Sequence, residues 1–362
     1  MRSYLLAHRA RWGKNINNHF IGLDHIRALA AFMVFTWHFI VGNVYGGVWD
    51  TVPVPVYPFS ILTQGHTGVA LFITLSGYLF AKLLDKKNIL YIPFIWTRFI
   101  RLAPLLILVV FIVGYTRFSN EGAIVPYLKS ILVGLIKPTL PNGGWSVTVE
   151  LHFYILLPFI LYLDRRWKGW LCVFLIVSII MKIILYKDLG DIQKLSYNTI
   201  IGRIDQFIFG IIAFKYRDYV SNQHVSVLFF LGLFLAFYSF FDTAGGLNSA
   251  PESIWIYLPL IEGAAYGLLI SWYDNSFQHS RGGVSQFIAY VGKCSYSIYL
   301  LHFFFVWKLF SYVNLNIYPL SNIYINIAFS LICFLLMMPI ASLSYHLIEK
   351  PFFRFKINYI KR

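Results

Sequence analysis

Apolar runs long enough to cross a lipid bilayer recur along the whole chain, and they constrain its fold more than any other feature. The hydrocarbon core of a bilayer is about 30 Å thick, so a helix that crosses it needs about 20 mainly apolar residues. Hydrophobic residues make up 58% of the 362 residues and charged residues only 12%, whereas soluble domains carry about 25% charged residues. The sequence therefore predicts an all-α, polytopic integral membrane protein built as a helical bundle.

The distribution of the apolar runs predicts about ten transmembrane helices, with both chain termini in the cytoplasm. We expect a cytoplasmic N-terminal tail (1–25), a transmembrane domain (26–348) and a cytoplasmic C-terminal tail (349–362). No internal repeat and no separate soluble domain is evident, and the basic N-terminus lacks the small-residue site at which a signal peptide is cleaved. The approximate spans are 26–46, 65–84, 102–118, 145–163, 170–186, 199–214, 225–241, 253–273, 294–313 and 322–348.

The formal net charge of +15 is large enough to suggest a nucleic-acid partner, so the placement of the basic residues decides its meaning. Lys and Arg gather at the ends of alternate apolar runs, as the positive-inside rule requires, and do not form one basic face. The charge therefore indicates membrane topology, and we expect no nucleic-acid partner. Cys172, Cys294 and Cys333 share no close spacing, which argues against a disulfide framework and a thiolate metal site, and we expect no metal.

The first span, GLDHIRALAAFMVFTWHF, carries two widely separated ionisable side chains inside an apolar helix. Arg27 and His38 are eleven residues apart, which in an α-helix places them on nearly the same face and about 16 Å apart along the axis. Arg27 then lies at the membrane edge and His38 near the midplane. Because ionisable residues inside a membrane are costly, this pair is the first candidate for function.

Arg98 and Arg101, in WTRFIRLAP, are three residues apart and would share one helical face at the cytoplasmic edge of the membrane. They are either anchors of the positive-inside type or, with Arg27, an anion site, because the guanidinium group matches the geometry of phosphate. A long ligand such as coenzyme A would keep its phosphates at this mouth while its reactive end reaches the midplane. His38 is then either a packed core histidine or a general base toward an acceptor hydroxyl.

Seven motifs lie in a characteristic order along nearly the whole chain: LDHIRALAAFMVFTWHF, GVALFITLSGYLF, WTRFIRLAP, WSVTVELHFYILLP, GRIDQFIFG, CSYSIYLLHF and SYHLIEKPF. In this order they resemble the bacterial acyltransferase 3 family of integral membrane O-acyltransferases. The family's arginine and histidine separated by ten residues correspond to Arg27 and His38, and its arginine pair corresponds to Arg98 and Arg101. The resemblance implies a ten-span enzyme of the bacterial cytoplasmic (inner) membrane. It would move an acyl group, usually acetyl, from cytoplasmic acyl-CoA to a glycan hydroxyl on the outer side.

Four further residues are candidates for the site. Glu150, in WSVTVE, lies about one and a half turns inside the outer end of its span, where an unpaired carboxylate is costly. It is either a structural hydrogen-bond partner or a functional residue that orients an imidazole or binds the acceptor sugar. Trp145 offers a ring face to a sugar, Ser146 lies beside it, and His302 matches the family motif. We assign Glu150 to catalysis and the other three to substrate binding.

Two other polar features are interpreted as structural. Arg203 and Asp205, on the sixth span, are expected to form a paired structural charge. Ser76, in LSGY, is either a nucleophile or, more in keeping with small residues in membrane helices, a mark of close helix packing.

The sequence thus favours a membrane O-acyltransferase of a cell-envelope glycan such as O-antigen of lipopolysaccharide, capsule or exopolysaccharide, free or lipid-linked. Arg27, Arg98 and Arg101 would hold the phosphates of acetyl-CoA, and His38 would accept the hydroxyl proton or carry the acyl group. Some family members carry a C-terminal esterase-like domain, so we expect this chain to work alone or with a separate protein. The alternatives are a secondary transporter or flippase of lipid-linked glycan, and an acyltransferase of lipids or small hydrophobic acceptors. A homo-oligomer is compatible with the sequence.

Overall fold

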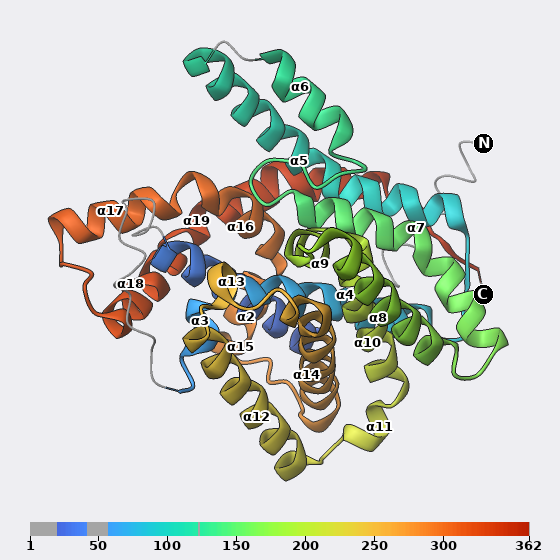
Figure 1. The fold of residues 1–362 in the computed structure, drawn as a ribbon. Coiled ribbons are helices and arrows are strands. Elements are labelled where there is room, and N and C mark those ends of the chain that lie inside the picture. Colours follow the sequence, from blue (N-terminus) through green and yellow to red (C-terminus); the bar gives the residue numbers. More distant parts are fainter. Residues whose placement is uncertain (1–19, 42–56, 122–123, 362) are drawn as a thin grey trace, which may run out of the picture.

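The computed structural model describes residues 20–41, 57–121 and 124–361, and helices dominate these parts of the chain (Figure 1). The longer helices are α2 (Ile21–Val41), α4 (Gly68–Leu84), α5 (Tyr91–Glu121), α7 (Trp145–Arg166), α8 (Trp170–Leu189), α10 (Ile200–Lys215), α12 (His224–Thr243), α14 (Ile254–Ser276) and α18 (Ile323–Leu336).

Short helices connect or extend the long ones. They are α3 (Ser60–Thr63), η3 (Gly65–Thr67), α6 (Ile124–Val133), α9 (Gln193–Asn198), α11 (Arg217–Val220), α13 (Gly246–Ser249), α15 (Gly283–Lys293), α16 (Ser295–Leu301), η4 (His302–Phe304), α17 (Val306–Asn316), α19 (Met338–Ser344), η5 (Tyr345–Glu349) and η6 (Lys350–Phe355). Within the described residues, β-structure is confined to β1 (Asn88–Ile89) and β2 (Ile360–Lys361), which pair antiparallel.

Seven helical segments of the described chain are long and apolar enough to cross a membrane, or eight if one bent pair is a single span. The predicted all-α membrane fold is therefore confirmed, while the number of ten spans stays a prediction. Two predicted spans are not among these segments. Helix α10 has only 16 residues, and α2 has 21 residues but is less apolar because it contains Asp24 and Arg27. Part of the first predicted span, 42–46, lies outside the described residues.

Helices α4 and α10 lie at the centre of the bundle. In the span that contains α4, 78% of an apolar stretch of 18 residues is buried, compared with 17% of such a stretch in α8 and 22% in α12. Helices α8 and α12 therefore form part of the outer surface. The backbones of α4 and α10 touch at Gly77 and Gly210: a Cβ on Gly77 would lie 2.1 Å from the carbonyl oxygen of Phe207. Small residues at helix crossings allow this close approach in membranes, and the prediction of close packing in the LSGY motif is confirmed.

The ninth predicted span is bent and not straight. Ser295–Phe304 and Val306–Asn316 meet at an angle of 59°, and the chain between them turns through the 3₁₀ helix η4. A helix break leaves backbone carbonyls without their usual partners. The imidazole of His302 lies at this break, and its Nδ1 donates to the carbonyl oxygen of Tyr299 at 2.7 Å and to that of Ile298 at 3.2 Å, which also accepts from the His302 backbone amide.

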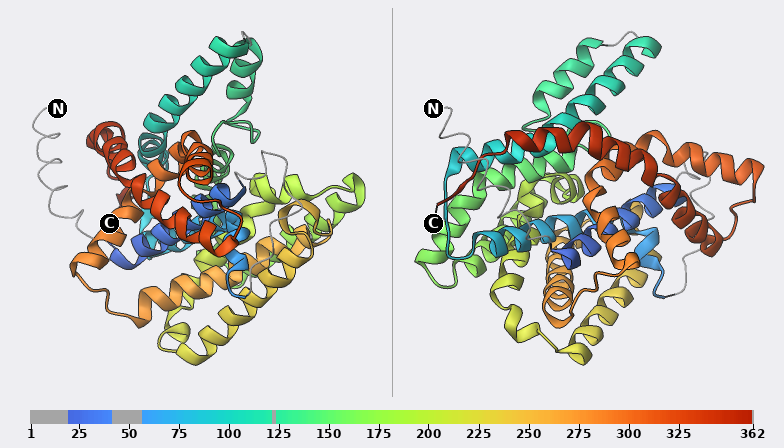
Figure 2. Two further views of the ribbon diagram at one scale, coloured as in Figure 1. Left: turned by 90° about the vertical axis from the view of Figure 1, so that its left-hand side faces the viewer. Right: turned by 180° about the vertical axis from the view of Figure 1, so that it is seen from behind.

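Helices α4, α7 and α10 all finish at one end of the bundle, which we call the basic end. Arg165 of α7 donates to the carbonyl of Leu84 at the end of α4, and Lys215 of α10 forms an ion pair of 2.7 Å with Asp164. Helix α5 also begins here, at Tyr91, eleven residues before its predicted start at 102. With α6, the far half of α5 forms a hairpin that projects from the bundle, at the top of Figure 1 and again in both views of Figure 2.

Candidate functional site

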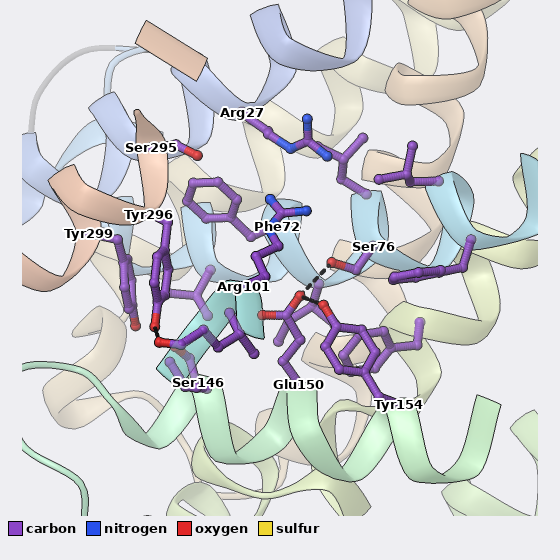
Figure 3. A pocket seen from close by; sticks show the side chains of 18 residues that line it. Arg27, Phe72, Ser76, Arg101, Ser146, Glu150, Tyr154, Ser295, Tyr296 and Tyr299 are labelled. Atoms are coloured by element: carbon purple, nitrogen blue, oxygen red, sulfur yellow. Dashed lines mark hydrogen bonds between the residues drawn. The ribbon is translucent and has the colours of Figure 1, made fainter. Parts of the chain in front are cut away.

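A pocket lies between α2, α4, α5, α7 and α16 (Figure 3). It takes in about 810 Å³ of space free of protein atoms, part of which is open to solvent. Apolar side chains of α4 form much of its wall. The polar lining residues are Arg27, Ser76, Arg101, Ser146, Glu150, Tyr154, Ser295, Tyr296 and Tyr299.

Arg101 is the basic residue that this pocket leaves uncompensated. Its guanidinium group makes no hydrogen bond and no ion pair with the residues in the described parts of the chain. The carboxylates of Glu150 and Glu349 act on it only at longer range. Arg27 differs, because it forms an ion pair with Asp24 one turn earlier on α2. A cation in a partly apolar pocket without a paired carboxylate favours the binding of an anion.

Glu150 lies inside the pocket and joins two of its helices. Its Oε1 accepts hydrogen bonds from the hydroxyl of Ser76 on α4, at 3.3 Å, and from the hydroxyl of Tyr154 on its own helix (Figure 3). Among the described residues, Glu150 forms no contact with His38, so the alternative in which it orients an imidazole gains no support from this pair. The two residues predicted to be catalytic therefore lie in different parts of the bundle.

His38 forms a pair with His302, which the sequence assigned separately to substrate binding. Nε2 of His302 lies 3.2 Å from Nδ1 of His38, and their ring centroids are 4.8 Å apart. The rings of Trp37 and Phe303 pack on His38 with centroid distances of 4.3 and 4.5 Å. His302 is buried and His38 is half-buried, so the pair sits in a mainly aromatic environment.

The hydrogen bonds of the pair determine which nitrogen of each ring carries a proton. Nδ1 of His302 faces the carbonyl oxygen of Tyr299, and Nδ1 of His38 faces that of Val34 at 2.9 Å. A carbonyl oxygen only accepts hydrogen bonds, so both Nδ1 atoms carry hydrogen. The single hydrogen on Nδ1 of His38 is then shared between the Val34 carbonyl and Nε2 of His302, and Nε2 of His38 keeps its lone pair. A neutral imidazole in this state is suited to accept a proton.

Tyr299 connects the pocket to the histidine pair. Its side chain lines the pocket, while its backbone carbonyl binds His302. The Tyr299 hydroxyl donates to the carbonyl of Gly143 at 3.0 Å, and the hydroxyl of Ser146 donates to the same oxygen at 3.1 Å. His38 itself is not among the residues that line the pocket. Tyr299 thus lies between the pocket and the histidine pair.

Trp145 lies outside the pocket lining, beside a buried charge network. Its ring packs on Tyr197, with centroids 5.0 Å apart, and the Arg203 guanidinium lies 5.8 Å from its ring centroid. Arg203 forms an ion pair of 3.3 Å with Glu262 of α14, and Asp205 pairs with Lys182 of α8. The expected pairing of Arg203 with Asp205 is therefore wrong, because residues two apart on a helix point in different directions.

Arg98 also lies outside the pocket lining, although it is only one turn from Arg101. Its guanidinium donates to the hydroxyl of Tyr359 at 3.0 Å and lies 4.9 Å from the ring centroid of Phe80. Phe80 lines the pocket on its other side. Of the predicted site residues, the pocket therefore gathers Arg27, Arg101, Ser146 and Glu150, whereas Arg98, Trp145, His38 and His302 surround it.

Three pocket tyrosines were not singled out from the sequence. Tyr296 and Tyr299 precede His302 at intervals of three residues, a spacing that places all three on one helical face. The Tyr296 hydroxyl donates to the carbonyl of Leu102 at 2.7 Å. Tyr154 follows Glu150 by four residues on α7, and that spacing likewise predicts their contact.

Fold and pocket together define a polytopic helical membrane protein with an internal pocket lined by two arginines and a glutamate. The chain belongs to the acyltransferase 3 family, because the family model, described as an acyltransferase domain, matches residues 20–346. Similar curated proteins include three from Staphylococcus aureus strains COL, MSSA476 and MRSA252, each carrying the name "Putative O-acetyltransferase". Each is 26% identical over 384 residues, which cover 91% of this chain. The chain spans 57% of the length of each of these relatives. No solved structure matches the chain.

Proposed function

We propose that the protein is a membrane O-acyltransferase that uses acyl-CoA, most simply acetyl-CoA, and transfers the acyl group to a hydroxyl of a cell-envelope glycan. One observation carries this proposal: a pocket with an unpaired arginine ends at Tyr299, next to a histidine whose Nε2 keeps its lone pair. Anion binding and proton acceptance are the two requirements of transfer from a phosphorylated thioester donor. Membership of the acyltransferase 3 family supports the reaction class.

The donor enters from the basic end of the bundle. Arg101 and Arg27 bind its phosphate groups inside the mouth, and Arg98 adds positive charge from behind Phe80. The narrow pantetheine arm follows the apolar face of α4. Its amide groups can donate hydrogen bonds to Glu150, which is the role we now propose for this residue in place of orienting His38.

The chemical step is acyl transfer to an alcohol. The hydroxyl oxygen attacks the thioester carbonyl carbon while its proton passes to Nε2 of His38. The carbon–sulfur bond then breaks, the acyl group remains on the oxygen as an ester, and the CoA thiolate takes the proton from His38. His302 acts as a positioning residue, since its Nε2 accepts the Nδ1 proton of His38 and its own Nδ1 is held by the Tyr299 carbonyl. Transfer through an acyl group on His38 uses the same residues.

The acceptor approaches from the end opposite to the donor. Trp145 and Tyr197 offer ring faces there, and such faces stack well on sugars. We propose a polysaccharide of the bacterial envelope, free or lipid-linked, as acceptor, and the cytoplasmic (inner) membrane as the site of action.

His38 is the residue with which to test the proposal. Purified protein is incubated with radiolabelled acetyl-CoA and candidate glycans, and we expect label in the glycan and release of free CoA. His38→Ala should lower the rate more than about 100-fold, the usual contribution of a general base. His224→Ala is the matched control, because His224 is the first residue of α12 and does not line the pocket. This variant should leave the rate unchanged.

Two results would contradict the proposal. A wild-type protein that leaves acetyl-CoA intact with every acceptor is not an acyl-CoA-dependent transferase, and a transporter would behave in this way. A His38→Ala variant with full activity would remove His38 from the mechanism. Mass spectrometry of the protein quenched without acceptor separates the two routes, because only the acyl-histidine route leaves an acetyl group on His38.

A further inference from the structure

Residues 356–361, which we call the C-terminal strap, do not extend away from the bundle. They run back across the start of α5 and are held there by backbone and side-chain hydrogen bonds. The Thr97 hydroxyl donates to the carbonyl of Ile357 at 3.0 Å, and the backbone amide of Leu90 donates to the carbonyl of Tyr359 at 2.8 Å. Strand β2 then pairs with β1 just before α5. The strap is therefore fixed to α5, the helix that carries Arg98 and Arg101.

The strap reaches the pocket wall through aromatic rings. Tyr359 accepts a hydrogen bond from Arg98 and packs its ring on Phe94, with centroids 5.4 Å apart. The Arg98 guanidinium lies between Tyr359 and Phe80, 5.2 and 4.9 Å from their ring centroids. Arg98 is only 7% exposed, and its Nε has no hydrogen-bond partner among the described residues. A buried guanidinium with an unused donor is incompletely satisfied by the protein alone.

Lys356, the first residue of the strap, adds another uncompensated cation. Its ammonium group lies 3.4 Å from the ring centroid of Phe353 and forms no hydrogen bond or ion pair with the described part of the chain. The charges that act on it are Arg101 and Arg98 from α5 and the carboxylate of Glu349 from η5. Burial, followed by these two arginines, lowers the pKa of Lys356 to about 7. Lys356, Arg98 and Arg101 therefore bring three positive charges into one region. Glu349 is the single carboxylate among the groups that act on Lys356.

We propose that the C-terminal strap forms one wall of the donor site and that Lys356, with Arg98 and Arg101, binds the phosphate groups of the donor. The inference rests on the proposed function, in which the donor is a CoA thioester. A group with several phosphates supplies the negative charge that this region lacks, and it can use the free Nε of Arg98 and the free ammonium of Lys356. Lys356 thereby selects for a phosphorylated donor and takes no part in acyl transfer.

The test compares two ligands that differ in their phosphates. Binding of coenzyme A and of pantetheine to the full chain in detergent is measured by calorimetry for wild type, Lys356→Gln, Lys356→Arg and Lys361→Gln. We expect Lys356→Gln to raise the dissociation constant of coenzyme A about tenfold, as the loss of one charged hydrogen bond does. Pantetheine binding should not change, and Lys356→Arg should retain coenzyme A affinity.

Lys361→Gln is the matched control, because Lys361 is an exposed cation on the same strap whose backbone pairs with Asn88. It should bind coenzyme A as wild type does. Equal losses in the Lys356→Gln and Lys361→Gln variants, unchanged affinity in Lys356→Gln, or a parallel loss of pantetheine binding would each overturn the inference. A wild-type protein that binds coenzyme A in the expected pattern but acylates no acceptor would instead refute the proposed function and leave this inference standing.

Discussion

His38 and His302 show how backbone carbonyls can orient a pair of imidazole rings inside a membrane protein. Each ring is held through Nδ1 by a carbonyl oxygen, and the two rings then bond to each other. The arrangement needs no carboxylate, which would be costly to bury at this depth. Both Nε2 atoms are then without a proton, and that of His38 makes no hydrogen bond with the described residues. His302 also lies at the break in the ninth span, so the histidine pair and the bend occupy the same place in the fold.

The pKa of Lys356 predicts that donor affinity depends on pH. Its ordinary value is 10.5 and the unliganded protein lowers it to about 7, so Lys356 is charged below pH 7 and increasingly neutral above it. A bound phosphate favours the charged form, and binding above pH 7 therefore requires uptake of a proton. We expect the dissociation constant of coenzyme A to rise roughly fivefold between pH 7 and pH 8, from proton linkage at one site. Calorimetry at both pH values measures this.

The groups that act on Lys356 are Arg98, Arg101 and Glu349, so the assignment of the pH dependence needs its own control. Arginine stays charged throughout this range. The Lys356→Arg variant should therefore bind coenzyme A with nearly the same affinity at pH 7 and pH 8. If this variant kept the wild-type pH dependence, a different group would be responsible.

The sequence predicted the position of a site residue only where the geometry of its own helix fixed that position. Arg27 and Arg101 were predicted to face one ligand, and both line the pocket. Arg98 has the same helical register as Arg101 but turns toward Tyr359, because a long side chain takes its direction from distant neighbours. Lys356 could not be predicted, since its place depends on a strap that folds back onto α5 from the far end of the chain.

The contact between α4 and α10 predicts where the fold is least tolerant of added volume. A Cβ on Gly210 would lie 2.1 Å from the carbonyl oxygen of Thr74 and 2.6 Å from the amide nitrogen of Tyr78. These are backbone atoms and cannot move aside by a change of rotamer. We expect Gly210→Ala to lower the free energy of unfolding by about 1–3 kcal/mol, the usual cost of overpacking. The melting temperature of the purified protein in detergent, followed by intrinsic fluorescence, measures the loss.

Gly232→Ala provides the comparison for this prediction. Gly232 lies in the middle of α12, and its added Cβ would meet only the Tyr57 hydroxyl, at 3.6 Å. Alanine has the higher helix propensity by about 1 kcal/mol, so this variant should melt at the wild-type temperature or above it. Similar destabilisation of both variants would mean that the α4–α10 crossing is not the sensitive contact.

The apolar runs in the sequence predicted where the helices lie, but not where they end or bend. The span predicted at 199–214 is observed as Ile200–Lys215, because its apolar run and its helix coincide. Helix α5 begins at Tyr91, well before the predicted 102, since Arg98 and Arg101 lie in the helix although they interrupt the apolar run. The bend near Phe305 has no proline or glycine to mark it in HFFFVW. His302 at this bend contacts His38 of α2, a tertiary contact that a local pattern does not reveal.

Charge is distributed unevenly between the two ends of the bundle, and this asymmetry gives the last prediction. Arg165, Lys215 and the C-terminal strap gather at the basic end. The positive-inside rule assigns such an end to the cytoplasm, where CoA thioesters are made. Alkaline phosphatase is active only outside the cytoplasm, so a fusion after Lys361 should be inactive, and green fluorescent protein at the same point should fluoresce.

A second fusion tests the opposite end of the same bundle. The turn at α13 follows the end of α12 that lies away from the basic end, and phosphatase joined after Asn248 should be active. The two fusions should give opposite results, because three crossings separate them when the bent pair counts as one span: α14, the pair formed by α16 and α17, and the segment Ile323–Phe355. An active phosphatase after Lys361 would place Lys356, Arg98 and Arg101 on the outer side, away from any supply of acyl-CoA. The phosphate site and the histidine pair would then need a donor that is available outside the cell membrane.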